Sequence, residues 1–165
     1  MSIKIKNKHR LKQKDKRKML QMIQDIFDEL IISDDAVIET GRLDEKQILF
    51  IDEIPCFFKE QEKLFFTIPG LLSLHPSKRE VVVDMGAVRF VTNGADVMSP
   101  GIVDADDSIV TDQEVWISDE QHHKPLAVGI ALMDGETMVA AQSGKAVEMK
   151  HFIGDQLWKK LQTIE

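Results

Sequence analysis

Residues 86–101 read GAVRFVTNGADVMSPG, and this stretch decides which fold we expect. Its first half has the pattern of a short helix whose apolar side chains can face a core, namely Val88, Phe90 and Val91. The pair Asn93-Gly94 is typical of a left-handed helix C-cap. A short extended segment, residues 95–98, follows, and Ser99-Pro100-Gly101 turns the chain sharply. The stretch therefore predicts one short helix beside one short strand.

Glycines stand at both ends of this predicted helix, Gly86 before it and Gly94 after it. A residue without a Cβ atom lets another backbone, or a phosphate, come close. A groove for a chain with exposed backbone phosphates is one interpretation of the pair. Helix capping accounts for both glycines equally well, so the two interpretations stay open at this point.

The composition is that of a soluble globular protein. The chain has 165 residues, 43% of them hydrophobic and 30% charged, enough for one ordinary domain or two small ones. Its apolar runs, such as 81–83 and 126–133, are too short to span a bilayer, and the N-terminus lacks an apolar signal core. The single cysteine, Cys56, has no partner for an intramolecular disulfide. We expect a cytoplasmic protein without a membrane partner.

The charge is distributed unevenly along the chain. The net charge is −7, yet residues 1–18 carry nine basic side chains and one acid, Asp15, a local charge of +8. Such a basic arm on an acidic body can attract phosphate groups locally, which is one interpretation of these side chains. The alternative is an exposed strand edge whose lysines deter edge-to-edge aggregation. The nine residues of this basic arm are Lys4, Lys6, Lys8, Arg10, Lys12, Lys14, Lys16, Arg17 and Lys18.

The first half of the chain predicts a small α+β domain, residues 1–76. Alternation over Ser2–Lys8 indicates a half-exposed strand, and apolar residues at helical spacing indicate a helix over 12–30. Further strands are expected at 36–40, 47–51, 56–59 and 64–68, with connections at 41–42 and 53–55 and a helical turn at 71–74. His75-Pro76-Ser77 reads as a linker, where we place a domain boundary.

The second half, residues 77–165, predicts a small barrel or barrel-like sheet with short helices. The expected strands are 80–84, 114–118, 125–132 and 145–152, with an acidic loop at 104–108. A helical turn at 136–142 and a closing helix at 155–163 complete the set. The fold class we expect is therefore α+β, with a small α+β domain followed by a pseudo-β-barrel.

The sequence contains no positive case for catalysis or for a metal or cofactor. Ser99 lies in no G-x-S-x-G turn, and Cys56 sits in an apolar strand as a structural thiol would. His122 and His123 are adjacent, which places them on opposite sides of an extended chain. The acidic run 104–112 lacks the glycine and the closing glutamate of a calcium loop. We expect neither an enzyme nor a metal site.

The segment VDMGAVRFVTNGADVMSPGI, residues 83–102, resembles the signature of the PUA domain, named for pseudouridine synthases and archaeosine transglycosylases. In that family a strand ends in Asp, Gly-Ala opens a helix, a second Gly-Ala follows about eight residues later, and Pro-Gly-Ile comes next. The matching residues are Asp84, Gly86, Ala87, Gly94, Ala95, Pro100, Gly101 and Ile102. The later segments PLAVGIALM and GKAVEMKHFIGDQLW also fit, so the resemblance extends over roughly residues 77–161.

The first half carries a second resemblance. FFKEQEKLFFTIPGLLSLHP, residues 57–76, is similar to the pre-PUA domain of the malignant-T-cell-amplified-sequence family, and the lysine-rich start resembles archaeal members of that family.

The resemblance implies RNA binding in the groove between the first PUA helix and the following strand, aided by the last strand. The amides of Gly86 and Ala87 would meet a phosphate or a base edge, and Gly94 and Ala95 would keep the groove floor low. Cationic and thioether side chains would contact phosphates and bases, whereas Phe90 suits a core position and His151 suits either packing or ligand. The implied RNA-binding residues are Gly86, Ala87, Arg89, Asn93, Gly94, Ala95, Met98, Pro100, Gly101, Met149, Lys150 and His151.

The resemblance further implies a non-catalytic protein that binds tRNA, at its CCA end, or rRNA, in translation initiation or ribosome recycling. The small ribosomal subunit and an initiation-factor-like protein are the implied partners. One alternative is the RNA-docking part of an RNA-modifying system of the pseudouridine or archaeosine type. Another is a protein-interaction module whose Phe-Phe strands are partly exposed.

Overall fold

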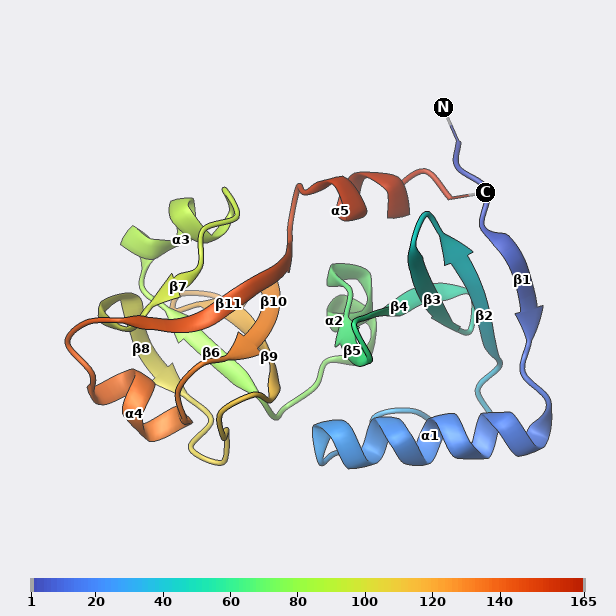
Figure 1. The fold of residues 1–165 in the computed structure, drawn as a ribbon, viewed down its shortest axis with the longest axis horizontal. Coiled ribbons are helices and arrows are strands. Elements are labelled where there is room, and N and C mark those ends of the chain that lie inside the picture. Colours follow the sequence, from blue (N-terminus) through green and yellow to red (C-terminus); the bar gives the residue numbers. More distant parts are fainter. Residues whose placement is uncertain (1, 165) are drawn as a thin grey trace. The chain divides into compact units, whose positions relative to one another are not determined.

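The computed structural model describes residues 2–164 and divides them into two compact units (Figure 1). The first unit runs to Pro76 and includes the segment from Lys159 onward, and the second is Ser77–Trp158. The end of the chain is thus grouped with the first unit, whereas the sequence placed it in the second. Long-range pairing explains the difference, because the Ile3 N–H donates to the Thr163 carbonyl at 2.9 Å and Lys160 pairs with Asp44.

A five-stranded antiparallel sheet forms most of the first unit, in the order β1-β2-β3-β4-β5. Its strands are β1 Lys6–Arg10, β2 Ile38–Leu43, β3 Lys46–Ile51, β4 Ile54–Glu60 and β5 Lys63–Phe66. The turns lie at 44–45, 52–53 and 61–62 rather than at 41–42 and 53–55. Gly41 is inside β2, and a Cβ there would overlap the Ile5 side chain. Gly41, which suggested a turn in the sequence, is therefore needed because the segment from Ile5 to Lys8 passes close to the backbone of β2.

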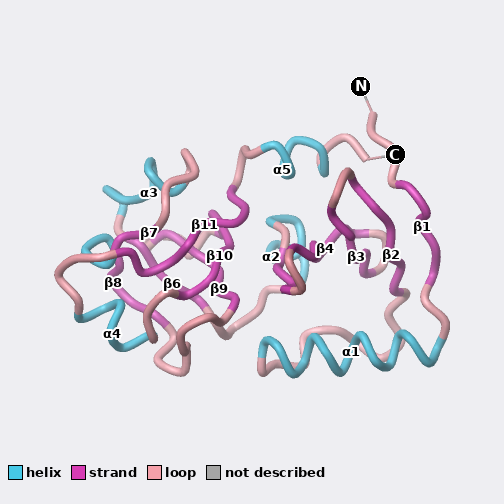
Figure 2. The backbone as a smooth tube through the Cα atoms, viewed as in Figure 1, coloured by secondary structure: helices cyan, strands magenta, loops and turns pink. Residues whose placement is uncertain are grey.

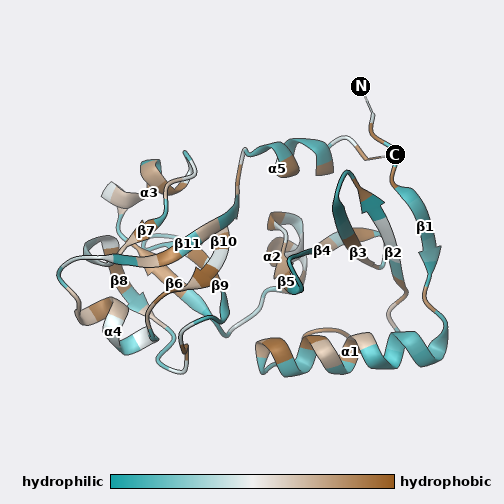
Figure 3. Cartoon of the chain, in the orientation of Figure 1, coloured by the Kyte–Doolittle hydropathy of each residue, from teal (hydrophilic) through white to brown (hydrophobic). Residues whose placement is uncertain are grey.

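Two helices, α1 Gln13–Phe27 and α2 Ile68–Leu74, complete this unit. α1 ends three residues earlier than predicted, because Asp28 adopts a left-handed conformation with φ of 54°. Figure 3 shows α1 hydrophilic at its start and more apolar toward its end. Phe27 packs on Phe66 with ring centroids 4.6 Å apart, and Phe57 lies 4.8 Å from Phe66.

The Phe-Phe pairs at 57–58 and 65–66 are all buried in the first unit. The expectation that they would be partly exposed in a protein-interaction module is therefore wrong. They lie on the neighbouring strands β4 and β5, where successive side chains on both faces of the sheet are buried.

The second unit is a nearly closed, barrel-like sheet with few, short helices, so the expected α+β class is confirmed (Figure 2). The strand order is β7-β11-β10-β9-β6-β8, with β6 parallel to β9 and the other pairs antiparallel. The strands are β6 Glu80–Val83, β7 Val97–Met98, β8 Ile102–Ala105, β9 Glu114–Asp119, β10 Pro125–Ala131 and β11 Lys145–Phe152. The helices are α3 Met85–Val91, the 3₁₀ turn η1 Ser99–Gly101, α4 Gly135–Ala140 and α5 Gln156–Leu161, which continues into the first unit.

β8 is a strand that the sequence did not predict. Its start follows the Pro-Gly turn directly, and its end overlaps the expected acidic loop at 104–108. Pairing with β6, in which Val83 faces Ile102 and Val82 faces Asp104, holds these residues extended. The pairing partner, and not the local composition, makes this segment a strand.

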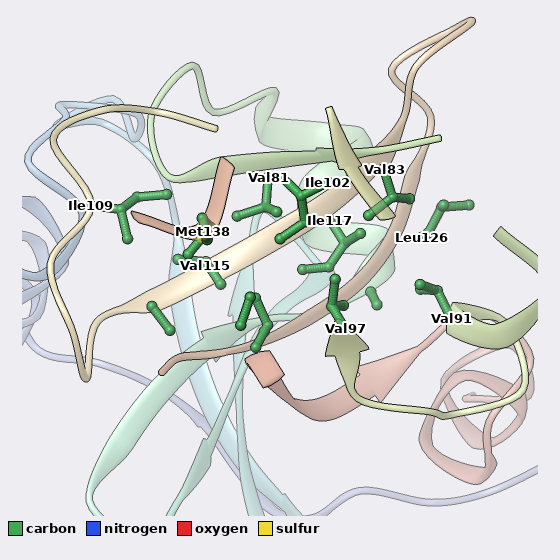
Figure 4. Close-up of a cluster of buried hydrophobic side chains, with 14 residues drawn as sticks. Val81, Val83, Val91, Val97, Ile102, Ile109, Val115, Ile117, Leu126 and Met138 are labelled. Atoms are coloured by element: carbon green, nitrogen blue, oxygen red, sulfur yellow. The ribbon is translucent and has the colours of Figure 1, made fainter. Parts of the chain in front are cut away.

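A core of buried aliphatic side chains fills the second unit (Figure 4). Val81, Val83 and Ile117 form its centre, and each is fully buried. Val91 at the end of α3 and Val97 on β7 also point into this core. These two anchors hold α3 and β7 against the barrel and so determine the space between them.

Candidate nucleic-acid interface

A hollow of about 450 Å³ lies between α3 and β7. It brings together six of the predicted site residues with five others that the prediction did not include. Its lining consists of Asp84, Gly86, Ala87, Phe90, Val91, Ala95, Asp96, Val97, Met98, Pro100 and Gly101. We call this hollow the α3–β7 groove.

Asp84 caps the N-terminus of α3. Its Oδ1 accepts a hydrogen bond from the Ala87 N–H at 2.8 Å, as an N-cap aspartate does. The Ala87 amide, which the sequence assigned to a phosphate or a base edge, is therefore already occupied. A carboxylate at this point also repels a phosphate. This end of the groove is consequently unsuited to phosphate binding, which corrects the expected role of Ala87.

The two glycines of the motif have different functions. A Cβ on Gly86 would meet only Asp84 Oδ1, at 3.4 Å, so this position leaves the groove wall open. Gly94 has φ of +90°, and a Cβ there would lie 2.8 Å from the Phe152 ring. Gly94 does not line the groove, so the expected role as its floor is not what the structure gives. Its backbone conformation and the neighbouring ring require glycine there.

Phe90 is exposed beside the groove, contrary to the expectation of a core position. Ala87, Val88 and Val91 pack toward the core, and the helix phase then leaves Phe90 on the groove side with 54% of its surface accessible. Met98 on β7 is also exposed, at 47%. An exposed aromatic ring and a thioether therefore border an open hollow.

Arg89 and Asn93 lie near the groove without lining it. The guanidinium of Arg89 is 4.8 Å from the centroid of the Phe90 ring, a cation–π contact. Asn93 is exposed in the turn after α3, and its N–H donates to the Phe90 carbonyl at 3.2 Å. Arg89 thus places a positive charge next to the exposed ring.

The three predicted residues of β11 do not line the groove. His151 is fully buried, and its Nδ1 lies 2.9 Å from Asp155 Oδ2, so its assignment as a ligand contact is wrong. Lys150 Nζ is 3.6 Å from Glu148 Oε1, and Met149 packs against the core. An irregularity in the pairing with β10 breaks the simple alternation along this strand, because Val128 faces His151 and Gly129 faces Met149.

The buried His151 and the half-buried Asp155 form a pair that shapes the chain after β11. Burial alone raises the pKa of Asp155, but hydrogen bonds from His151 and from the amides of Trp158 and Phe152 outweigh it and lower that pKa below its ordinary value. The Asp155 carboxylate is therefore a structural acceptor at the start of α5.

The basic arm extends from Lys4, just before β1, through β1 into the first turns of α1. Eight of its nine side chains are exposed, and Lys16 is half-buried. Lys8 Nζ sits 4.4 Å from the centroid of the Phe50 ring. Because β1 is an edge strand of its sheet, both interpretations of the lysines remain open: phosphate binding and protection of the edge.

Other titratable groups have structural surroundings. Burial raises the pKa of the Cys56 thiol to about 12. A hydrogen bond with Glu80 Oε2 at 2.8 Å raises the pKa of the exposed His123. Within residues 2–164, no three His, Cys, Asp or Glu side chains are arranged to hold a metal ion. Over the same residues no helix is long and apolar enough to cross a membrane.

Comparison with known proteins matches both halves of the chain. Residues 79–153 match the PUA domain family, and residues 7–74 match a domain of unknown function, DUF1947. An uncharacterized protein of Methanocaldococcus jannaschii is 41% identical over 156 residues, which cover 93% of this chain and 96% of that protein. Translation machinery-associated protein 20 of Saccharomyces cerevisiae is 30% identical over 150 residues, covering 86% and 81%. The crystal structure of a hypothetical protein from Pyrococcus horikoshii has a TM-score of 0.83 at 34% identity, covering 92% of this chain and 98% of that one.

These matches confirm the resemblance that the motif at 83–102 and the upstream Phe-Phe segment suggested. The chain therefore belongs to the family of PUA-domain proteins that includes translation machinery-associated protein 20 and malignant T-cell-amplified sequence 1.

Proposed function

We propose that this protein is a non-catalytic RNA-binding protein of the translation machinery. It takes an unpaired RNA segment into the α3–β7 groove of the second unit, and the basic arm of the first unit contacts RNA phosphates. The CCA end of tRNA is the proposed target, with rRNA as the second candidate. The observation that carries the proposal is an open groove bordered by the exposed Phe90 ring and Met98.

The chemistry of the groove supports an unpaired nucleotide rather than a duplex. Proteins that read single-stranded RNA stack splayed bases on aromatic side chains, and Phe90 offers such a surface. Arg89, held against the Phe90 ring, is placed to neutralise a phosphate next to a stacked base. Stacking of this kind contributes about 1–3 kcal/mol per base.

The relatives support a setting in translation. The yeast relative is named for its association with the translation machinery, and it matches the chain over both halves. Initiation or ribosome recycling in the cytoplasm is the proposed setting, with the small ribosomal subunit and an initiation-factor-like protein as proposed partners.

The test is binding to tRNA with and without its CCA end, measured by fluorescence anisotropy with wild-type protein and a Phe90→Ala variant. Val139→Ala is the matched control, because Val139 is an exposed apolar residue on α4 of the same unit and lies outside the groove. We expect Phe90→Ala and removal of CCA each to weaken binding about tenfold, and Val139→Ala to leave it unchanged. Equal binding of tRNA with and without CCA, by the wild-type protein and by the Phe90→Ala variant alike, would contradict the proposal.

A further inference from the structure

The side of α1 that points away from its buried residues, Ile23 and Phe27, is an open surface of the first unit. A hollow of about 460 Å³ lies there, and 37% of the Met22 side chain is exposed beside it. The residues that line this hollow are Lys18, Gln21, Met22, Asp25 and Ile26. All five belong to α1, and we call this surface the outer face of α1.

The charges along α1 are arranged against its helix dipole. A helix favours acidic side chains near its N-terminus and basic ones near its C-terminus. The first half of α1 instead carries four basic side chains and one acid, Asp15, and its last turn has no basic residue. Asp25 stands in the second half. Because this order of charges is unfavourable within one helix, the helix alone does not account for it.

A second copy of α1, laid antiparallel on the outer face, brings opposite charges together. If a twofold axis passes between Gln21 and Met22, Lys18 of one copy is level with Asp25 of the other, because both are equally far from that axis along the helix. The symmetry then makes this pair twice, with Met22 at the centre of the contact. Packed helices lie about 8–10 Å apart, a distance that these side chains can bridge. A parallel arrangement would instead set Lys18 beside Lys18, which is repulsive.

The two charged groups are available for such pairs. The Lys18 side chain makes no ion pair within residues 2–164. Asp25 Oδ1 accepts a hydrogen bond from Gln21 Nε2 at 2.9 Å, and a carboxylate has further acceptor sites. Lys18 and Asp25 can therefore pair with a second copy without losing a contact within their own chain.

We infer that the outer face of α1 is a self-association surface, on which a second copy of this chain packs its own α1 in antiparallel orientation. One helix face per copy covers less than the total of about 1,200 Å² that stable interfaces bury, so the dimer is reversible and forms at high protein concentration. The inference goes beyond the proposed function and does not depend on it, because these residues lie outside the α3–β7 groove.

Sedimentation equilibrium of the RNA-free protein tests the inference. RNA is removed because Lys18 also belongs to the basic arm. The mass should rise from the 18.8 kDa of one chain at about 5 µM toward twice that value at about 500 µM. Met22→Glu places two like charges at the centre of the contact and should raise the dimer Kd at least about tenfold. Leu72→Glu is the matched control, because Leu72 is an exposed apolar residue on α2 of the same unit, and it should leave the Kd unchanged.

Two charge reversals test the antiparallel orientation. Lys18→Glu alone, or Asp25→Lys alone, sets like charges together at both symmetric pairs and should raise the homodimer Kd about tenfold. Mixed in equal amounts, the two variants should associate with each other about as tightly as wild-type chains do, because opposite charges then meet at both pairs. A chain that carries both substitutions should regain the wild-type dimer Kd for the same reason.

The outcomes bear on the inference separately from RNA binding. A wild-type protein that stays monomeric at about 500 µM would overturn self-association. A dimer that Met22→Glu leaves intact, or that Leu72→Glu weakens equally, would overturn the assignment to the outer face of α1. Charge variants that fail to associate when mixed, although circular dichroism shows them folded, would overturn the antiparallel arrangement. None of these results would alter binding of RNA in the α3–β7 groove.

Discussion

The contrast between Gly94 and Gly86 gives the sharpest prediction. Both glycines belong to the motif that identified the fold, but only Gly94 has a positive φ, +90°, and a neighbour, the Phe152 ring, at 2.8 Å from the position of an added Cβ. Gly86 has an ordinary φ and open space beside it. The two residues should therefore respond oppositely to substitution.

Replacing Gly94 by Ala should destabilise the second unit. A left-handed conformation costs an alanine about 1–2 kcal/mol, and displacing the packed Phe152 ring adds about 1–2 kcal/mol. A loss of about 2–4 kcal/mol lowers the Tm of a unit of this size by about 10–20 °C. Thermal unfolding followed by circular dichroism or calorimetry measures it.

Replacing Gly86 by Ala should leave the Tm unchanged or raise it slightly, because Ala is favoured over Gly in a helix by about 0.5–1 kcal/mol. Gly86→Met should also fold, but its side chain would fill the groove and weaken tRNA binding about tenfold. A Gly94→Ala protein that melts within about 2 °C of wild type would refute the backbone argument. Wild-type RNA affinity in a folded Gly86→Met protein would refute the assignment of the groove.

Three further predictions concern other parts of the chain. Replacing Lys14, Arg17 and Lys18 of α1 together by Gln should leave the Tm within about 2 °C and reduce the salt dependence of tRNA binding. The slope of log Kd against log salt concentration should fall by about 0.7 for each lost phosphate contact, and an unchanged slope would contradict phosphate contacts by these three side chains. Because the pKa of Asp155 is lowered in the folded state, its contribution to stability is present above its unfolded pKa, near 3.8, and is lost as the pH falls through the folded value. Asp155→Asn should therefore lower the Tm at pH 7. It should also make the Tm difference between pH 7 and pH 3 smaller than in the wild-type protein. An equal Tm difference in the two proteins would exclude a pH-dependent contribution of Asp155 to stability. Cys56, buried and with a pKa of about 12, should resist a thiol reagent at pH 8 in the native protein and react fully in denaturant; rapid native labelling would show that the first unit opens.

Much of the fold followed from local sequence patterns. Alternating apolar residues marked most strands, and the motif at 83–102 led to the PUA domain that the comparisons confirm. These features depend on residues near one another in the chain, which is why periodicity and turn chemistry detect them. The location of a groove between α3 and β7 was also predicted, because this helix and this strand are separated by only a few residues.

What the sequence missed depended on partners distant in the chain. β8 is a strand because β6 pairs with it, and Gly41 is a glycine because Ile5 lies against it. His151 is buried on β11, where it faces Val128 of β10. Phe90 was placed in the core because an isolated helix does not reveal which of its apolar residues face the barrel.

The sequence by itself thus determined most of the elements, the family and the position of the groove along the chain. Only the tertiary structure decided which side chains line the groove, since it left Phe90 exposed and buried His151 away from it. The physical reason is that local geometry sets where a helix begins and ends, whereas exposure and hydrogen-bond capacity depend on every element packed around it.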